Sequence, residues 1–149
     1  FFAGCTDPCK DVVCNNGECV EGDCVCDAGY EGIDCATAFN AKFSGTYNLS
    51  ETCDTTGSDA YTVTIVPSSA APAQATITGL YREQVGVVAA IGTDGVSFEI
   101  ASTDIGPGTI VSDGACTSNS DGSSITVHYK FTNETSGSFE SCTTTLTRQ

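Results

Sequence analysis

From residue 43 to the end of the chain, apolar side chains recur at every second position, in runs separated by turn-forming residues. Because successive side chains of a β-strand point to opposite faces, this alternation predicts strands with one buried and one exposed face. No window has the period of an amphipathic helix. The clearest runs are Phe43, Tyr47 and Leu49; Tyr61, Val63 and Ile65; Val85, Val87, Ala89 and Ile91; Val96, Phe98 and Ile100; and Ile125, Val127, Tyr129 and Phe131.

Weaker runs lie near residues 75–80, 109–112 and 138–147, and turn signals such as Asp94-Gly95 and Asp121-Gly122 separate the runs. About eight short strands in just over 100 residues predict an all-β fold. Either an antiparallel β-barrel or a β-sandwich fits this spacing.

The first part of the chain is organised by cysteines instead. Six of them follow the spacing C-x4-C-x4-C-x4-C-x-C-x8-C, at Cys9, Cys14, Cys19, Cys24, Cys26 and Cys35. A segment of about 30 residues buries too little apolar surface to fold unaided, so crosslinks must restrict its unfolded state. Spacing alone leaves about 15 pairings open.

The end of this cysteine series carries a specific pattern. It reads C-x-C-x-x-G-Y-x-G-x-x-C from Cys24 to Cys35 and resembles an EGF-like module over residues 7–35. The resemblance implies the pairs Cys9–Cys19, Cys14–Cys24 and Cys26–Cys35, with Tyr30 as the aromatic lid of a very small core. The acidic run that precedes the first cysteine in calcium-binding modules of this kind is reduced here to Thr6-Asp7-Pro8, so we expect no metal site.

The chain therefore divides into an N-terminal segment (1–6), the EGF-like module (7–35), a linker (36–41) and an antiparallel β domain (42–149). The opening Phe1-Phe2-Ala3-Gly4-Cys5 resembles the end of a lipoprotein signal, which would make Cys5 a lipid anchor. The strand from Phe43 to Leu49 resembles the opening strand of lipocalin-like barrels, with Tyr47 in place of tryptophan. The whole order is similar to that of a family of bacterial surface lipoproteins.

Four cysteines lie outside the EGF-like series. Cys53 ends the first strand of the β domain and Cys142 lies early in the last. In an up-and-down barrel with an even number of strands these two strands are antiparallel neighbours, which predicts a Cys53–Cys142 bridge and places Tyr47 roughly opposite Arg148. Bridges Cys53–Cys116 and Cys116–Cys142 are the competing possibilities.

If Cys53 pairs with Cys142, Cys116 and Cys5 are left over. We expect Cys116 to lie in an exposed polar loop, residues 115–122. Cys5 and Cys116 could then pair within one chain if the EGF-like module folds back over the β domain, or form a disulfide between chains. Lipidation of Cys5 is the alternative.

Composition fixes the compartment and excludes several partners. Ten cysteines in 149 residues indicate an oxidising, extracytoplasmic setting, and the absence of a CxxC pair together with a single histidine argues against zinc. A net charge of −14 repels nucleic acid and anionic lipid headgroups. No apolar stretch approaches the roughly 20 residues of a membrane-spanning helix.

No residue pattern for catalysis or for a cofactor stands out. The single histidine, His128, alternates with the apolar positions of its strand and is expected on the solvent face with Thr126 and Lys130. There is no G-x-S-x-G motif, and Glu83, Glu99, Glu134 and Glu140 occur singly along the β domain. We therefore expect a protein that is not an enzyme and needs no cofactor.

These observations favour an extracellular or cell-surface protein that acts through protein–protein contacts, either in adhesion or as a subunit of a fibre or sheath. Self-assembly could use unpaired strand edges of the β domain and the apolar Phe1 and Phe2. The alternative is a lipocalin-like protein whose barrel binds a small apolar ligand.

Overall fold

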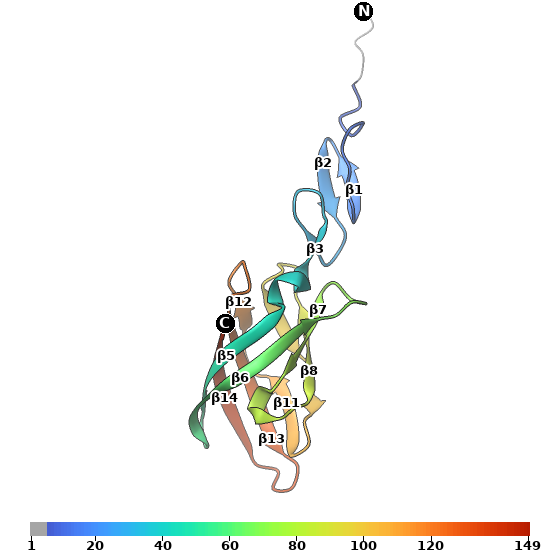
Figure 1. The fold of residues 1–149 in the computed structure, drawn as a ribbon. Helices are drawn as coiled ribbons and strands as arrows, with labels where there is room; N and C mark the ends of the chain where they lie inside the picture. Colours follow the sequence, from blue (N-terminus) through green and yellow to red (C-terminus); the bar gives the residue numbers. More distant parts are fainter. Residues whose placement is uncertain (1–5) are drawn as a thin grey trace, which may run out of the picture.

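The computed structural model describes residues 6–149, so Phe1, Phe2 and Cys5 lie outside the described residues. The molecule is elongated, with a narrow segment that carries six cysteines projecting from one end of a β-barrel (Figure 1). Residues 6–38 are called the six-cysteine segment below. No helix among the described residues is long and apolar enough to cross a membrane.

Two small two-stranded sheets build the six-cysteine segment. Strand β1 (Gly17–Val20) pairs with β2 (Asp23–Cys26), and β3 (Tyr30–Glu31) pairs with β4 (Thr37–Ala38), both antiparallel. The segment has little core, and its fixed geometry comes from three disulfides. These are the pairs that the EGF-like resemblance implies, namely Cys9–Cys19, Cys14–Cys24 and Cys26–Cys35.

The remaining strands form a closed antiparallel barrel. Each strand pairs with the next along the chain, and β14 pairs with both β13 and β5, which closes the sheet. Two of the eight barrel strands are interrupted, one into β9 and β10 and the other into β11 and β12. The strands are β5 (Gly45–Cys53), β6 (Gly57–Pro67), β7 (Gln74–Thr78), β8 (Gly86–Ile91), β9 (Ser97–Ile100), β10 (Thr103–Asp104), β11 (Gly108–Ser112), β12 (Cys116–Ser118), β13 (Ser124–Asn133) and β14 (Phe139–Arg148).

This topology confirms the predicted all-β class and the count of eight strands, and it selects a barrel over a sandwich. It also corrects one expectation. Closure gives every long strand a hydrogen-bonded neighbour on both sides, and among the described strands of the barrel only the two-residue β10 has an unpaired edge. The long unpaired edges expected for self-assembly are therefore not present among the described residues, because a closed barrel removes its own edges.

The alternating apolar residues fill the barrel, as their period predicts. Inward positions of β5, β13 and β14 such as Tyr47, Leu49, Tyr129 and Leu146 are at most 2 % exposed. Phe43 differs from its prediction as the first residue of a strand. It ends a short 3-10 helix, η1 (Phe39–Phe43), which connects the six-cysteine segment to the first barrel strand, and its side chain is buried.

The predicted linker, residues 36–41, is an ordered junction. It contains β4 and the start of η1, and the backbone N–H of Phe39 donates to the carbonyl of Gly29 (2.8 Å). Asn40 is 3 % exposed, and its side-chain amide donates to the carbonyls of Ser68, Ala71 and Gln74 at 2.7–3.0 Å. These hydrogen bonds tie η1 to the connection between β6 and β7, next to the six-cysteine segment.

Candidate functional site

A buried carboxylate lies inside the barrel, where apolar side chains would be expected. Glu51 follows Tyr47 and Leu49 on the inward face of β5 and is only 5 % exposed. Its Oε1 atom accepts a hydrogen bond from the hydroxyl of Tyr61 (3.2 Å). Its Oε2 atom accepts from Thr144 Oγ1 (3.2 Å) and from the hydroxyl of Tyr129. Three hydroxyls from three strands therefore satisfy one charge that would otherwise be costly to bury.

The tyrosines in this network remain donors over the ordinary pH range. Burial raises the pKa of Tyr129, and the hydrogen bond to Glu51 and its negative charge raise it further. Burial, followed by the charge of Glu51, raises the pKa of Tyr61 in the same direction. Since neither phenol gives up its proton readily, this cluster is suited to holding a carboxylate and not to moving a proton.

A second carboxylate, Glu140, lies near the end of the barrel remote from the six-cysteine segment. It accepts from the hydroxyl of Tyr81 (2.6 Å) and from the backbone N–H groups of Thr55 (3.1 Å) and Thr56 (2.9 Å). Burial opposes the charge of Glu140, but these hydrogen bonds together outweigh it and lower the pKa of the carboxyl. The native state therefore favours the charged form of Glu140.

The lowered pKa of Glu140 gives an expected dependence of stability on pH. A depressed pKa stabilises the native state fully above the ordinary glutamate pKa of about 4.3, and this contribution disappears as the pH falls through the native value. We expect Glu140→Gln to lower the melting temperature at neutral pH and to lower it less as the pH is reduced below about 4. Thermal melts of both proteins between neutral and acidic pH measure this, and a constant difference in melting temperature across the range would contradict it.

Tyr81 connects the two carboxylates. Its ring stacks on that of Phe131, with centroids 4.0 Å apart, and its backbone N–H donates to the hydroxyl of Tyr61 (2.9 Å). Tyr81 and Arg82 both have positive φ angles, 55° and 60°, a conformation that costs non-glycine residues energy. The short 3-10 turn η2 (Leu80–Arg82) is thus held across this end of the barrel by the contacts of Tyr81.

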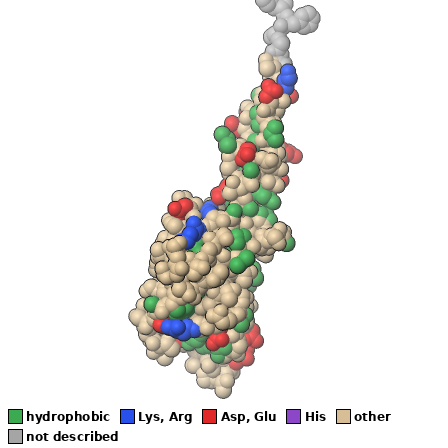
Figure 2. All heavy atoms as spheres, in the orientation of Figure 1, with side chains coloured by type: hydrophobic (Ala, Val, Ile, Leu, Met, Phe, Trp, Pro, Cys, Tyr) green, Lys and Arg blue, Asp and Glu red, His purple; other side chains and the backbone are tan. Residues whose placement is uncertain are grey.

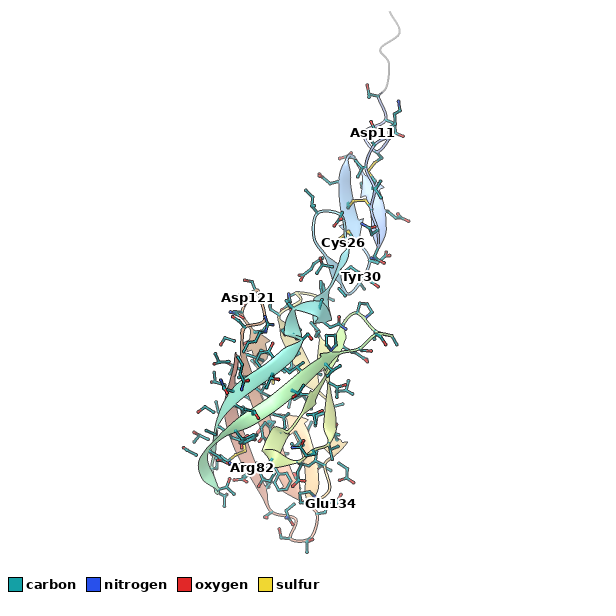
Figure 3. All side chains as sticks on the ribbon, viewed as in Figure 1. Asp11, Cys26, Tyr30, Arg82, Asp121 and Glu134 are labelled. Atoms are coloured by element: carbon teal, nitrogen blue, oxygen red, sulfur yellow. A yellow bond between two sulfur atoms is a disulfide. The ribbon has the colours of Figure 1, made fainter. Side chains whose placement is uncertain are left out.

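An open cavity of about 280 Å³ lies beside this turn, with Glu51 and Tyr81 in its wall. Its rim carries an exposed ion pair between Arg82 and Asp59, and the Arg82 guanidinium lies 4.8 Å from the centre of the Tyr61 ring. Figure 3 places Arg82 on the barrel, far from Tyr30 in the six-cysteine segment. The cavity therefore presents charges of both signs and aromatic surface to a small polar molecule.

The apolar interior of the barrel is nearly filled by its own side chains. A cavity of about 20 Å³ remains among them, and its lining includes Phe43, Ile77, Phe98 and Ile125. A space of this size holds about one water molecule. A barrel of eight strands is narrow enough for side chains alone to occupy it.

One group of side chains has the composition of a metal site without its chemistry. The ligand atoms of Glu51, Cys53 and Cys142 lie within 4.8 Å of one another. The two sulfurs, however, are joined to each other in a disulfide. Metal ions bind cysteine as thiolate, so this trio offers only one carboxylate as a ligand.

The predicted Cys53–Cys142 disulfide is present between the first and last strands of the barrel. In the same ladder Tyr47 is directly opposite Arg148, as expected. The competing bridges, Cys53–Cys116 and Cys116–Cys142, do not form. Cys116 has no disulfide partner among the described residues.

The expectation that Cys116 lies in an exposed loop is wrong. It begins β12 and is only 2 % exposed. The reason is that residues 113–115 interrupt a strand, which resumes at Cys116 and pairs with β9 at Phe98. The backbone N–H of His128 donates to the Cys116 sulfur (3.4 Å), and burial raises the pKa of the thiol, so Cys116 is a poor nucleophile.

The other residues singled out from the sequence lie apart from the two carboxylates. His128 is on the outer face of β13 with Thr126 and Lys130, and its Nδ1 atom lies 3.2 Å from Thr143 Oγ1. Tyr30 is half-buried in the six-cysteine segment, where β3 pairs with β4.

The sequence contains a signal for the two carboxylates that was missed. Glu51 is separated from Tyr47, Leu49 and Cys53 by an even number of positions, so it falls on the inward face of the same strand. Glu140 falls on the inward face with Cys142 for the same reason. An acidic residue at an inward position of a predicted strand is unusual because a buried charge requires partners. The partners themselves come from distant strands and have no local signature.

No family model matches this chain, and no curated protein matches it. Among solved structures, it is similar to the structure of EF1p2_mFAP2b bound to DFHBI, with a TM-score of 0.51 and 19 % identity over 72 % of this chain and 94 % of the other. A redesigned beta barrel is similar with a TM-score of 0.48 and 14 % identity over 76 % of this chain and 97 % of the other. At these identities the first likeness establishes the barrel fold alone.

Proposed function

We propose that this protein is a non-enzymatic, extracytoplasmic protein that binds a partner protein through its six-cysteine segment, with the barrel as a rigid base. The observation that carries the proposal is a concentration of exposed apolar side chains on the smallest part of the molecule. They are Val13, Val20, Val25 and Ile33, with exposed fractions of 75 %, 50 %, 58 % and 95 %. Exposed apolar residues gathered on one segment mark a contact surface.

The pairing of β1 with β2 places two of these valines on one face. Glu18 is opposite Val25 and Val20 is opposite Asp23, so all four side chains lie on the same side of the hairpin. This hairpin face, defined by these four residues, alternates apolar and acidic groups. Its best complement is an apolar surface edged with basic side chains.

The charge of the whole segment points to the same kind of partner. Residues 6–38 contain eight acidic residues and a single basic one, Lys10. A basic partner would be attracted over a distance set by the ionic strength, and its association would weaken as salt is added.

Three further observations support the non-enzymatic and extracytoplasmic parts of the proposal. The two inward carboxylates, Glu51 and Glu140, are each held by hydroxyl or N–H donors. His128 is on the outer face of β13, away from both of them. The four disulfides indicate an oxidising compartment.

Site-specific photocrosslinking from Val25 tests the proposed contact. A photoreactive residue at Val25 is expected to form a discrete adduct with a basic protein from the native extracellular material. The yield should fall in Val20→Asp protein and with added salt, because both changes weaken a contact that combines apolar and charged groups. A matched probe at Ser136, in the exposed turn between β13 and β14, should give no such adduct. Equal adducts from both positions, or none from Val25, would refute the proposal.

A second candidate function, the binding of a small molecule, has one observation in its favour. The cavity of about 280 Å³ beside Glu51 and Tyr81 is open and lined by charged and aromatic side chains, and EF1p2_mFAP2b, which shares the barrel fold, binds DFHBI. The nearly filled apolar interior does not favour the lipocalin-like form of this idea. Native mass spectrometry of unreduced protein distinguishes the candidates, since a retained small molecule would support the second one.

A further inference from the structure

The outer face of five consecutive barrel strands carries no charged side chain. On β14, β5, β6, β7 and β8 every side chain that alternates with the buried positions is neutral. Hydroxyl groups predominate, and the rest are small or apolar. This neutral face consists of Phe139, Ser141, Thr143, Thr145 and Thr147; Thr46, Asn48, Ser50 and Thr52; Ser58, Ala60, Thr62, Thr64 and Val66; Gln74, Thr76 and Thr78; and Gly86, Val88 and Ala90.

The neutrality of this face is notable in a protein with a net charge of −14. The acids are elsewhere. Eight lie in the six-cysteine segment, Glu51 and Glu140 are inside the barrel, and most of the others are in turns and loops between strands. Figure 2 shows the same distribution on the visible side of the barrel, where red and blue side chains gather toward the two ends and the surface between them is mostly tan and green.

Strand pairing aligns the neutral side chains into rows across the sheet. Thr147, Asn48 and Thr62 form one row, and Thr46, Thr64 and Thr78 form another. A third row, Val66, Thr76 and Val88, is the most apolar, with its two valines 55 % and 45 % exposed. The face thus combines hydroxyls, threonine methyl groups and exposed valines.

We propose that the neutral face is a contact surface for a second copy of this chain, with two barrels packed side by side about a twofold axis near β6. Two molecules of the same large negative charge repel each other in most orientations. This orientation brings together surfaces without charges, so it meets the least repulsion. In a twofold contact each side chain near the axis approaches its own copy, and a charge there would be especially unfavourable.

The size of the face limits the strength of this contact. Barrel curvature allows about three strands to touch at once, and strand dimensions then give roughly 36 Å by 14 Å, or on the order of 500 Å² per copy. This is below the roughly 800 Å² per partner of a stable interface, so we expect a weak dimer that depends on protein concentration.

The effect of salt separates this self-contact from the partner contact proposed above. Added salt screens the repulsion between two acidic copies and should strengthen their association. The same salt should weaken an association between the acidic hairpin face and a basic partner. The two proposals use different surfaces, and either one can fail without the other.

Sedimentation equilibrium of the full chain tests the self-contact, with Thr64→Glu and Thr64→Gln as a matched pair. Thr64 is exposed in the middle of β6, so both variants should fold, which circular dichroism verifies. We expect the average mass of the wild-type protein to approach twice the monomer mass as the protein concentration rises. The protein concentration needed for this should be lower in about 1 M salt than in about 0.15 M salt. Thr64→Gln should associate within about twofold of wild type, whereas Thr64→Glu should associate at least about tenfold more weakly.

Three outcomes would overturn the proposal. One is a wild-type protein that stays monomeric at high concentration in high salt. Another is equal association of the Thr64→Glu and Thr64→Gln variants. The third is a loss of association in Val25→Asp protein, because this would place the self-contact on the hairpin face instead.

Discussion

Replacing Cys53 and Cys142 together by alanine is expected to lower the free energy of unfolding by about 4 to 5 kcal/mol. The disulfide joins residues 89 positions apart and connects the first strand of the barrel to the last. Without it, the unfolded chain gains the entropy of a long open loop, and β5 and β14 keep only their ladder of hydrogen bonds. Urea unfolding under non-reducing conditions measures the difference.

The matched control is Cys116→Ala, which removes a buried sulfur and breaks no disulfide to a described residue. It should cost no more than about 2 kcal/mol, the usual range for deleting a small buried group. If the double variant were as stable as the control, the β5–β14 ladder and side-chain packing would suffice to close the barrel, and the proposed contribution of the disulfide would be wrong.

Glu51→Ala is expected to destabilise the protein by about 3 kcal/mol or more. The substitution leaves the hydroxyls of Tyr61, Tyr129 and Thr144 without their acceptor inside the barrel, and each unpaired buried donor costs free energy. Glu51→Gln should cost less, because its amide oxygen can still accept. Unfolding curves for both variants give these values.

Ser50→Ala provides the reference for Glu51. It changes the neighbouring residue of the same strand but on the exposed face, and should alter stability by no more than about 0.5 kcal/mol. A Glu51→Ala protein that matched Ser50→Ala would show that water enters the barrel and replaces the carboxylate.

Local regularities of the sequence predict most of the fold. The alternation of Tyr61, Val63 and Ile65 predicts a strand because side chains two positions apart in a strand point to the same face of the sheet. The predicted Cys53–Cys142 bridge depends on an up-and-down barrel, in which the first and last strands are neighbours, and the structure confirms both the bridge and the strand pairing. These signals predict the strands and one bridge, but they leave the barrel and the sandwich as alternatives, which the pairing of β14 with both β13 and β5 decides.

The errors arise where structure depends on distant contacts. The sequence predicts a loop at Cys116 because β12 has three residues, too few to show alternation, and because its strand is interrupted at Gly114. The left-handed conformation of Tyr81 has no signal in a non-glycine residue. It is maintained by Tyr61, Phe131 and Glu140, which come from three other strands.

The closing disulfide also determines how the molecule would respond to mechanical tension. A pull on residues 6 and 149 is transmitted through Cys53 directly to Cys142, so the chain between these two cysteines, which are 89 positions apart, carries no load. Only the residues outside this loop can be extended, and three further crosslinks restrict those of the six-cysteine segment. The protein should therefore behave under load as a short and nearly inextensible link.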